Sequence, residues 1–365
     1  MYHYLLYYLY LVIISIQRHI MDSDDEMLIW TTLLMGQHLL EESLDDENDI
    51  YCSPPYRPPI MYEKKNWLLV DTGWGDTECL EYLRFSRAEI VELIRHLGLV
   101  EWVDSTTKAP GGYARYAEQG LCILLYRLAS PGRLKNMMHV FGVSRSQISS
   151  IVNDLAEFLY EKSHKKLLWD YARLLLDQLH TYVKAIDETV EASIEIWGFI
   201  DGTVRPIARP IKEQQQYYSG YKGHHGIKYQ SIVTPDGLIS SLYGPELGSK
   251  SDWKLWQKSG VKQVLQQLFG SQNLPNLPSL LSPPCLYRDP AYALSYRISE
   301  SYRAGRGGGV TPEQEAFNVV MSKYRIVVEW GFANVLNQFS AGEWKHMQKV
   351  GLSPVSINYI ISVLL

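Results

Sequence analysis

The stretch Trp197-Gly198-Phe199-Ile200-Asp201-Gly202-Thr203 is an apolar run that ends in a carboxylate followed directly by glycine. Bulky apolar and aromatic side chains favour a buried β-strand, and a glycine after the acid permits a turn. We therefore expect Asp201 to lie at the end of a strand, where a rigid scaffold holds a polar side chain in place.

The chain after this stretch alternates between strand-like and helical patterns. Strand-like runs occupy 197–200, 204–208, 228–233, 238–243 and 285–288, and helical stretches occupy about 251–269, 311–321 and 324–338. This mixed order predicts an α/β domain, which we assign to residues 196–365.

The preceding residues, 81–195, have a helical pattern. Ser86 and Glu89 are spaced as a capping box, 116–128 has the composition of an apolar helix, and we expect 161–196 to be helical throughout. We therefore predict an all-α region before the α/β domain.

Residues 133–159 have the pattern of two helices around a turn, with Gly142 at the turn and Ser144 as the cap of the second helix. This arrangement is typical of a DNA-binding helix-turn-helix. Short polar and basic side chains would then contact phosphates or base edges, namely Arg145, Ser146, Gln147 and Ser149. The alternative is a plain helical hairpin.

Residues 1–80 form an acidic, proline-containing segment. The apolar run 2–15 is shorter than the roughly 18–20 residues that span a bilayer, so we read it as a packed helix rather than a membrane anchor. Residues 53–60 contain four prolines and predict a linker.

The composition narrows the class of protein. The chain has 365 residues, of which 46% are hydrophobic and 21% are charged, and this composition predicts packed cores. Its net charge is -5, so we expect any contact with DNA to be confined to local basic patches. None of the four cysteines forms a CxxC pair, so a zinc ribbon has no support and a reducing compartment is the simpler interpretation.

Three later carboxylates are candidates to join Asp201. Asp289 follows the strand-like run 285–288, Glu329 lies in an apolar helical segment, and Asp252 precedes a helix. Carboxylates suit Mg²⁺, and two such ions supply an activated water and neutralise a leaving oxygen in phosphodiester cleavage. The alternatives are a turn-forming Asp201, a helix-capping Asp252 and a solvent-exposed Glu329.

A basic and aromatic band lies between the first two acids. Its members include Arg205, Lys222, His224 and Lys228, interspersed with Tyr217, Tyr218 and Tyr221. Such a band fits a polyanion, and its aromatic rings can stack on unpaired bases.

These motifs together resemble the nuclease domain of PIF/Harbinger transposases. The resemblance covers about 195–365 and is carried by Asp201-Gly202-Thr203, by the stretch 217–230, by Gly248-Ser249-Lys250-Ser251-Asp252, by Asp289-Pro290-Ala291-Tyr292 and by Glu329-Trp330-Gly331-Phe332. It implies an RNase H-like mixed sheet with flanking helices, and a catalytic, metal-binding triad of Asp201, Asp289 and Glu329. Asp252 would be an auxiliary metal ligand.

The resemblance also implies an activity. Proteins of this family use two divalent ions, Mg²⁺ or Mn²⁺, to hydrolyse double-stranded DNA at transposon ends and to join the freed 3′ hydroxyl to target DNA. It further implies a Myb-like accessory protein. Nuclear localisation is inferred from the presumed DNA substrate, and we also expect a homo-oligomer and no membrane association. Arg288, which departs from the family pattern, would either pair with Asp289 or hold the scissile phosphate.

Two other functions stay open at this point. One is a domesticated, transposase-derived nuclear protein that binds DNA or protein without cutting. The other is an RNase H-like hydrolase acting on RNA, against which the helix-turn-helix pattern argues, because a recognition helix suits the major groove of B-DNA.

Overall fold

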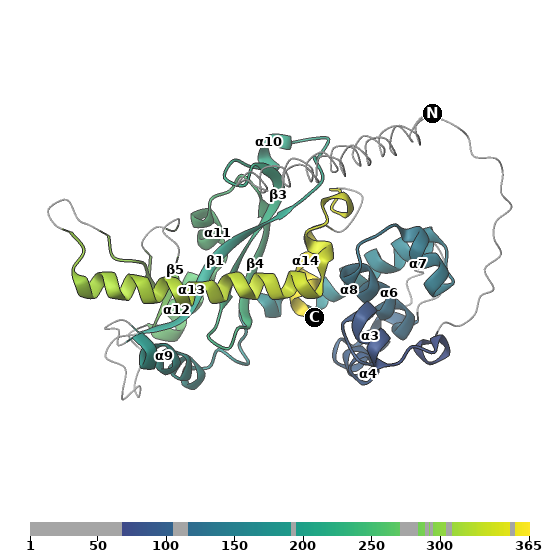
Figure 1. The fold of residues 1–365 in the computed structure, drawn as a ribbon, viewed down its shortest axis with the longest axis horizontal. Helices are drawn as coiled ribbons and strands as arrows, with labels where there is room; N and C mark the ends of the chain where they lie inside the picture. The colour runs from purple at the N-terminus through teal and green to yellow at the C-terminus, as the bar shows by residue number, and fades with distance from the viewer. Residues whose placement is uncertain are drawn as a thin grey trace, which may run out of the picture. The chain divides into compact units, whose positions relative to one another are not determined.

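The computed structural model describes residues 68–104, 116–190, 195–270, 284–288, 292, 295–303, 309–350 and 355–365. Residues 62–365 form one compact unit (Figure 1). The apolar run 2–15 and the proline-containing linker lie outside the described residues. Within the described ranges, no helix is long and apolar enough to cross a membrane.

The first part of this unit is helical, as predicted. The short 3-10 helix η2 (Leu69–Thr72) precedes α3 (Asp76–Leu83), α4 (Arg87–His96), α5 (Leu99–Asp104), α6 (Ala117–Ala129), α7 (Leu134–Phe141), α8 (Arg145–Leu168) and α9 (Leu176–Val190). The predicted capping box of α4 is confirmed, because Ser86 Oγ accepts from the Glu89 amide and the Glu89 carboxylate accepts from the Ser86 amide.

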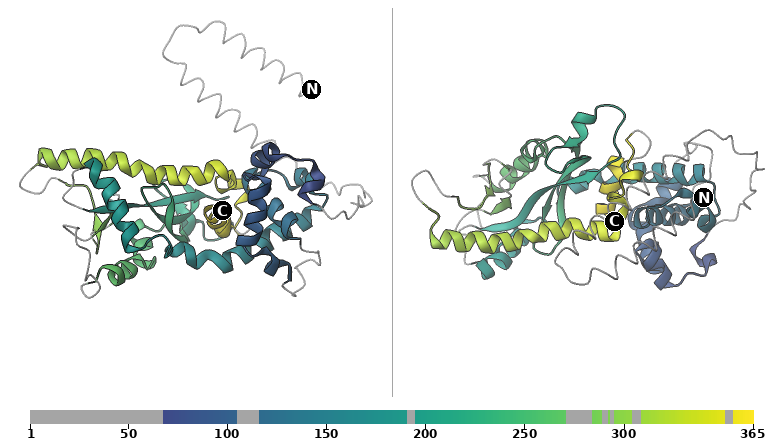
Figure 2. Two further views of the ribbon diagram at one scale, coloured as in Figure 1. Left: turned by 90° about the horizontal axis from the view of Figure 1, so that it is seen from below. Right: turned by 45° about the horizontal axis from the view of Figure 1, so that its top comes forward.

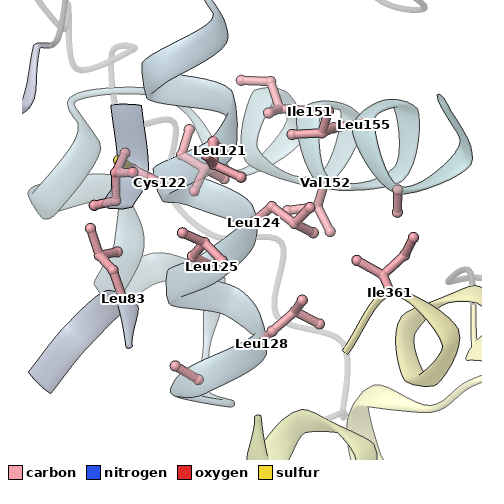
Figure 3. Close-up of a cluster of buried hydrophobic side chains, with 14 of the residues drawn as sticks. Leu83, Leu121, Cys122, Leu124, Leu125, Leu128, Ile151, Val152, Leu155 and Ile361 are labelled. Carbon is pink, nitrogen blue, oxygen red and sulfur yellow. The ribbon is translucent and has the colours of Figure 1, made fainter. Parts of the chain in front are cut away.

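The helices pack around α6. Figure 3 shows four α6 leucines, Leu121, Leu124, Leu125 and Leu128, beside Ile151, Val152 and Leu155 of α8, with Ile361 of the C-terminal helix next to them. The same cluster includes Phe339 and Ala341. The core of the helical region is therefore continuous with residues from the end of the chain.

The helical stretch 161–196 is interrupted, contrary to our prediction. The extended residue Trp169 ends α8 and packs edge-on against Trp197 of the sheet, with 5.7 Å between ring centroids. Arg173 then pairs with Asp170 and with Asp236. Burying Trp169 against the sheet outweighs the helical propensity of the segment, and α9 begins afresh at Leu176.

The second part contains a mixed sheet, which confirms the predicted α/β class. Its strands are β1 (Ile196–Pro206), β2 (Tyr218–Ser219), β3 (His224–Val233), β4 (Ile239–Leu247), β5 (Cys285–Arg288) and β6 (Ile298–Ser299). The order is β2-β3-β1-β5-β6, with β4 also paired to β3. Strand β1 is antiparallel to β3 and parallel to β5.

Helices cover both faces of this sheet. Ile200 and Ile232 pack against α11 (Asp252–Lys258) and α12 (Val261–Phe269), whereas Phe199 and Val233 pack against α13 (Pro312–Gln338). Figures 1 and 2 show α13 running along the sheet. The remaining elements are α10 (Gln214–Tyr217), η3 (Ser340–Gly342), η4 (Lys345–Met347) and α14 (Val355–Leu364).

The two helices predicted at 311–321 and 324–338 are a single helix. Thr311 caps α13 with Gln314, and Pro312 occupies the first turn. Met321, Val328 and Phe332 then form one buried face across the predicted gap. Continuous packing on the sheet explains why the polar residues between the two stretches do not end the helix.

Candidate functional site

Asp201 lies inside β1 and not at its end, so this detail of the prediction is wrong. It is paired with Ser231 of β3, the next residue Gly202 is paired with Gln230, and the strand continues to Pro206. The ladder with β3 is continuous on both sides of the acid. A mid-strand carboxylate is held by paired backbone before and after it, which fixes its position closely.

Asp201 shares a sheet face with Phe199, because side chains two apart in a strand point the same way. The Phe199 ring stacks on Tyr324 of α13, with 6.5 Å between centroids and an interplanar angle of 8°. Asp201 is therefore on the face that α13 covers.

Glu329 lies on a part of α13 that is turned away from β3 and β4. Gly331 faces β3 and β4, since a Cβ there would be 3.1 Å from Val233 Cγ2 and 3.9 Å from Ile239 Cγ1. Residues two apart in a helix differ by about 200° in direction, so Glu329 points away from β3 and β4.

The environment of Glu329 is more open than the sequence suggested. Its side chain is 58% exposed and forms a loose ion pair with Arg325, with 3.7 Å between Oε1 and Nη2. The expectation of a carboxylate surrounded by apolar neighbours is wrong, because only one side of α13 packs on the sheet and Glu329 falls outside that stripe.

The third predicted acid, Asp289, lies outside the described residues. It is the residue after Arg288, which ends β5 and is paired with Ile200 of β1. The Arg288 side chain is 1% exposed, pairs with Glu300 at 2.5 Å and donates to the Tyr292 carbonyl. A guanidinium so buried has no access to a phosphate, so that alternative for Arg288 is wrong.

Asp252 and Lys228 lie on the other face of the sheet. Lys228 Nζ is 2.9 Å from Asp252 Oδ1 and donates to the Lys250 carbonyl at 3.1 Å. Both side chains lie over Gly202, because a Cβ there would be 3.0 Å from Asp252 Cγ and 3.7 Å from Lys228 Cε. Gly202 and Asp201 point to opposite faces, which disfavours Asp252 as an auxiliary metal ligand beside Asp201.

The predicted helix-capping alternative for Asp252 is also wrong. The N-cap of α11 is Ser251, and Asp252 is the first residue of the helix. A carboxylate in the first turn still interacts favourably with the helix dipole. Its ion pair with Lys228 links α11 to β3.

We expect this ion pair to contribute to stability as a unit. Because the side chains are 13% and 20% exposed, Lys228→Met or Asp252→Asn should each lower the free energy of unfolding by about 1–3 kcal/mol. The double variant should lose less free energy of unfolding than the sum of the two single losses, and the difference should be about 1 kcal/mol or more. Urea unfolding of the four proteins tests this, and strictly additive losses would show that the pair is not coupled.

Comparison with known proteins identifies the region that holds these acids. Residues 200–364 match the family model of the DDE superfamily endonucleases. The match begins in β1, next to Asp201, and ends in α14. This part of the chain is therefore similar to the DDE superfamily endonucleases.

One curated relative supports the same conclusion more weakly. The chain is 27% identical over 132 residues to the probable transposase for insertion sequence element IS702 of Microchaete diplosiphon. The similarity covers 36% of this chain and 42% of that protein, so it spans less than half of each. No solved structure matches the chain.

The donor chemistry of residues 200–364 fits a hard divalent ion. Asp201 and Glu329 provide carboxylate oxygens, the ligands that Mg²⁺ and Mn²⁺ prefer. Among the described residues, no three metal-binding side chains form a group. A complete triad therefore depends on Asp289, which lies outside the described residues.

The helices predicted to bind DNA are present, and their role stays a prediction. Gly142 adopts a left-handed conformation between α7 and α8, and Ser144 caps α8. Arg145 and Ser146 are exposed, and Ser149 is half-buried. The Gln147 amide oxygen accepts from the Ser144 amide at 3.1 Å and completes the cap, and contact of Gln147 with DNA stays a prediction.

The basic and aromatic band divides into exposed and enclosed members. Lys222 is exposed, with Nζ 5.3 Å from the centroid of the Tyr221 ring, and that ring is 93% exposed. His224 is half-buried, with Nδ1 3.1 Å from the His225 carbonyl. Contact of these residues with DNA stays a prediction.

Arg205 belongs to the enclosed members. Its side chain is 11% exposed and lies 3.5 Å from Glu343, and its guanidinium covers the Tyr359 ring at 5.2 Å. It also donates to the Thr203 hydroxyl. These contacts hold the end of β1 against the C-terminal segment, so a structural role for Arg205 is better supported than DNA contact.

Ser231 is a residue near the site that sequence reasoning missed. It lies opposite Asp201 and is 1% exposed. A signal was present, because Gln230 and Ser231 are polar residues between Tyr229 and Ile232 in a stretch that we predicted as a strand. Buried polar side chains at the centre of a sheet need hydrogen-bond partners, so such residues are candidates for a role near the site.

Proposed function

We propose that this chain is a metal-dependent DNA endonuclease and strand transferase of a DNA transposon. It hydrolyses phosphodiesters at the element ends and joins the freed 3′ hydroxyl to target DNA. The observation that carries the proposal is the DDE endonuclease match over 200–364, which begins at the strand that holds Asp201. The ordered motifs of residues 201–332 favour the PIF/Harbinger type.

In this proposal, Asp201, Asp289 and Glu329 hold two Mg²⁺ or Mn²⁺ ions. When bound, these ions supply an activated water or hydroxyl and neutralise charge on the leaving oxygen. Asp201 contributes a carboxylate whose position the β1–β3 ladder fixes. Glu329 contributes a carboxylate on an exposed helix flank, where it can contact both an ion and solvent.

Residues outside the triad bind the DNA. Arg145 and Ser146 at the start of α8, together with the exposed Lys222, supply contacts to phosphates. This part of the binding is electrostatic and weakens as salt increases. A Myb-like accessory protein, a homo-oligomer and nuclear localisation belong to the same proposal.

Cleavage of DNA that carries the terminal inverted repeats flanking the gene tests the proposal. We expect Mg²⁺- or Mn²⁺-dependent nicking at the repeat ends. Binding of this DNA without cleavage, also after addition of a Myb-like partner, would instead indicate a domesticated DNA-binding protein and contradict the proposal.

Glu329→Gln is expected to lower the cleavage rate by about 10³-fold or more, because an amide removes the anionic metal ligand while preserving size. Glu315→Gln is the matched control, since Glu315 is also an exposed acid of α13. The two variants should unfold at the same urea concentration. Equal cleavage by both would remove Glu329 from the triad.

A further inference from the structure

Ser231 carries an unusual hydroxyl. It lies in the middle of β3, between Asp201 of β1 and Leu242 of β4, and is 1% exposed. Among the described residues, its Oγ has no hydrogen-bond partner. A buried hydroxyl without a partner destabilises a fold, so its presence calls for a physical explanation.

Its neighbours do not provide one. The flanking residues on the same face are Tyr229 and Val233, and Leu242 lies opposite in β4; all three are buried. Burial raises the pKa of Tyr229 far above its ordinary value, so that phenol stays neutral. On this face the Asp201 carboxylate, a strong acceptor, is directly across the ladder from Ser231.

Two other buried hydroxyls, one in this sheet and one directly after β3, are satisfied. Ser241 Oγ donates to the Leu168 carbonyl at 2.7 Å, and Thr234 Oγ1 donates to Asp236 at 2.6 Å. Other buried polar atoms of the described sheet also lack a partner, among them Gln230 Oε1 and Trp197 Nε1, but these are not hydroxyls. The unpartnered Ser231 hydroxyl lies opposite Asp201, the first candidate acid.

The geometry places the two side chains within reach of each other. Directly opposite residues of an antiparallel pair have Cβ atoms about 4.5–5.5 Å apart and point to the same face. Asp201 Oδ1 now accepts from the Gly202 amide at 2.7 Å. A small rotation of the carboxylate would bring one of its oxygens to the Ser231 hydroxyl.

We propose that Ser231 is a positioning residue for Asp201, donating its hydroxyl to one carboxylate oxygen while the other oxygen binds the divalent ion. The inference rests on the proposed function, in which Asp201 is a metal ligand. Such a hydrogen bond fixes the orientation of the ligand, and removing contacts of this kind typically weakens metal binding or activity by about 10–100-fold.

The proposal predicts that Ser231→Ala weakens the response to metal without lowering the thermal stability of the metal-free protein. Without metal, the variant should melt at the same temperature as the wild type or up to about 4 °C higher, because an unsatisfied buried hydroxyl is removed. The Mn²⁺ concentration that gives half-maximal thermal stabilisation, and half-maximal cleavage, should rise about 10-fold.

Ser241→Ala is the matched control, because it removes a buried serine hydroxyl from the same sheet that has a partner. It should melt at a lower temperature than the wild type and require the same Mn²⁺ concentration. An unchanged Mn²⁺ requirement in Ser231→Ala, with a wild type that responds to Mn²⁺, would overturn the role of Ser231 alone. If wild type and Asp201→Ala respond identically to Mn²⁺, the metal-site assignment itself fails.

Discussion

Asp201→Ala is expected to abolish metal-dependent DNA cleavage, with a loss of about 10⁴-fold or more, while leaving the fold intact. Losses of this size follow when a central group of a catalytic constellation is removed. Asp201 is half-buried in the middle of β1, where the ladder with β3 continues on both sides and keeps the strand in place. The measurement is the rate of nicking of repeat-end DNA in Mg²⁺ or Mn²⁺.

Two further variants separate charge from shape at this position. Asp201→Asn keeps the size and removes the anionic ligand, so it should be as inactive as Asp201→Ala. Asp187→Asn, an exposed acid on α9, is the control and should cut at the wild-type rate. A protein that cuts equally well without Asp201 would refute the assignment of the site.

Gly202→Ala is expected to lower the free energy of unfolding by about 2–3 kcal/mol and to reduce cleavage strongly. A Cβ at this position would fall inside contact distance of the Asp252 carboxylate, 3.0 Å from its Cγ. Asp252 must then move and leave Lys228, whose pairing distance is 2.9 Å. Overpacking and a broken, largely buried ion pair each destabilise by amounts of this order.

Gly220→Ala is the control for this substitution. A Cβ at Gly220 would have no atom within 4 Å, so this variant should unfold like the wild type. Urea unfolding gives the stabilities, and the nicking assay gives the activities. Equal stabilities of the two variants would show that the space over Gly202 is not filled as described.

Much of the element pattern could be predicted from the sequence. The run 285–288 coincides with β5, and 228–233 and 238–243 fall within or beside β3 and β4. These segments combine apolar composition with clear breaks. The helix break at Trp169 could not be predicted, because it depends on a ring contact with Trp197, which is distant in the chain.

The residue types of the candidate site could also be predicted, but the face of the sheet on which each side chain lies could not. Asp201 looked like a strand end because glycine follows it, whereas Gly202 is needed for the close approach of Asp252. Arg288 looked available to phosphate but is buried and paired with Glu300. Strand register and helix packing determine such placements, and neither can be predicted from a local sequence pattern.

The core of the helical region has a consequence for how such chains can be recombined. It includes Phe339, Ala341 and Ile361 from the end of the chain, and Arg84 donates to the Gln338 carbonyl at 3.0 Å. A chimera that exchanges residues 68–190 without also exchanging the C-terminal segment would leave apolar cavities on both sides of the junction. Engineering or natural exchange of the helical region would therefore have to transfer the C-terminal segment together with it.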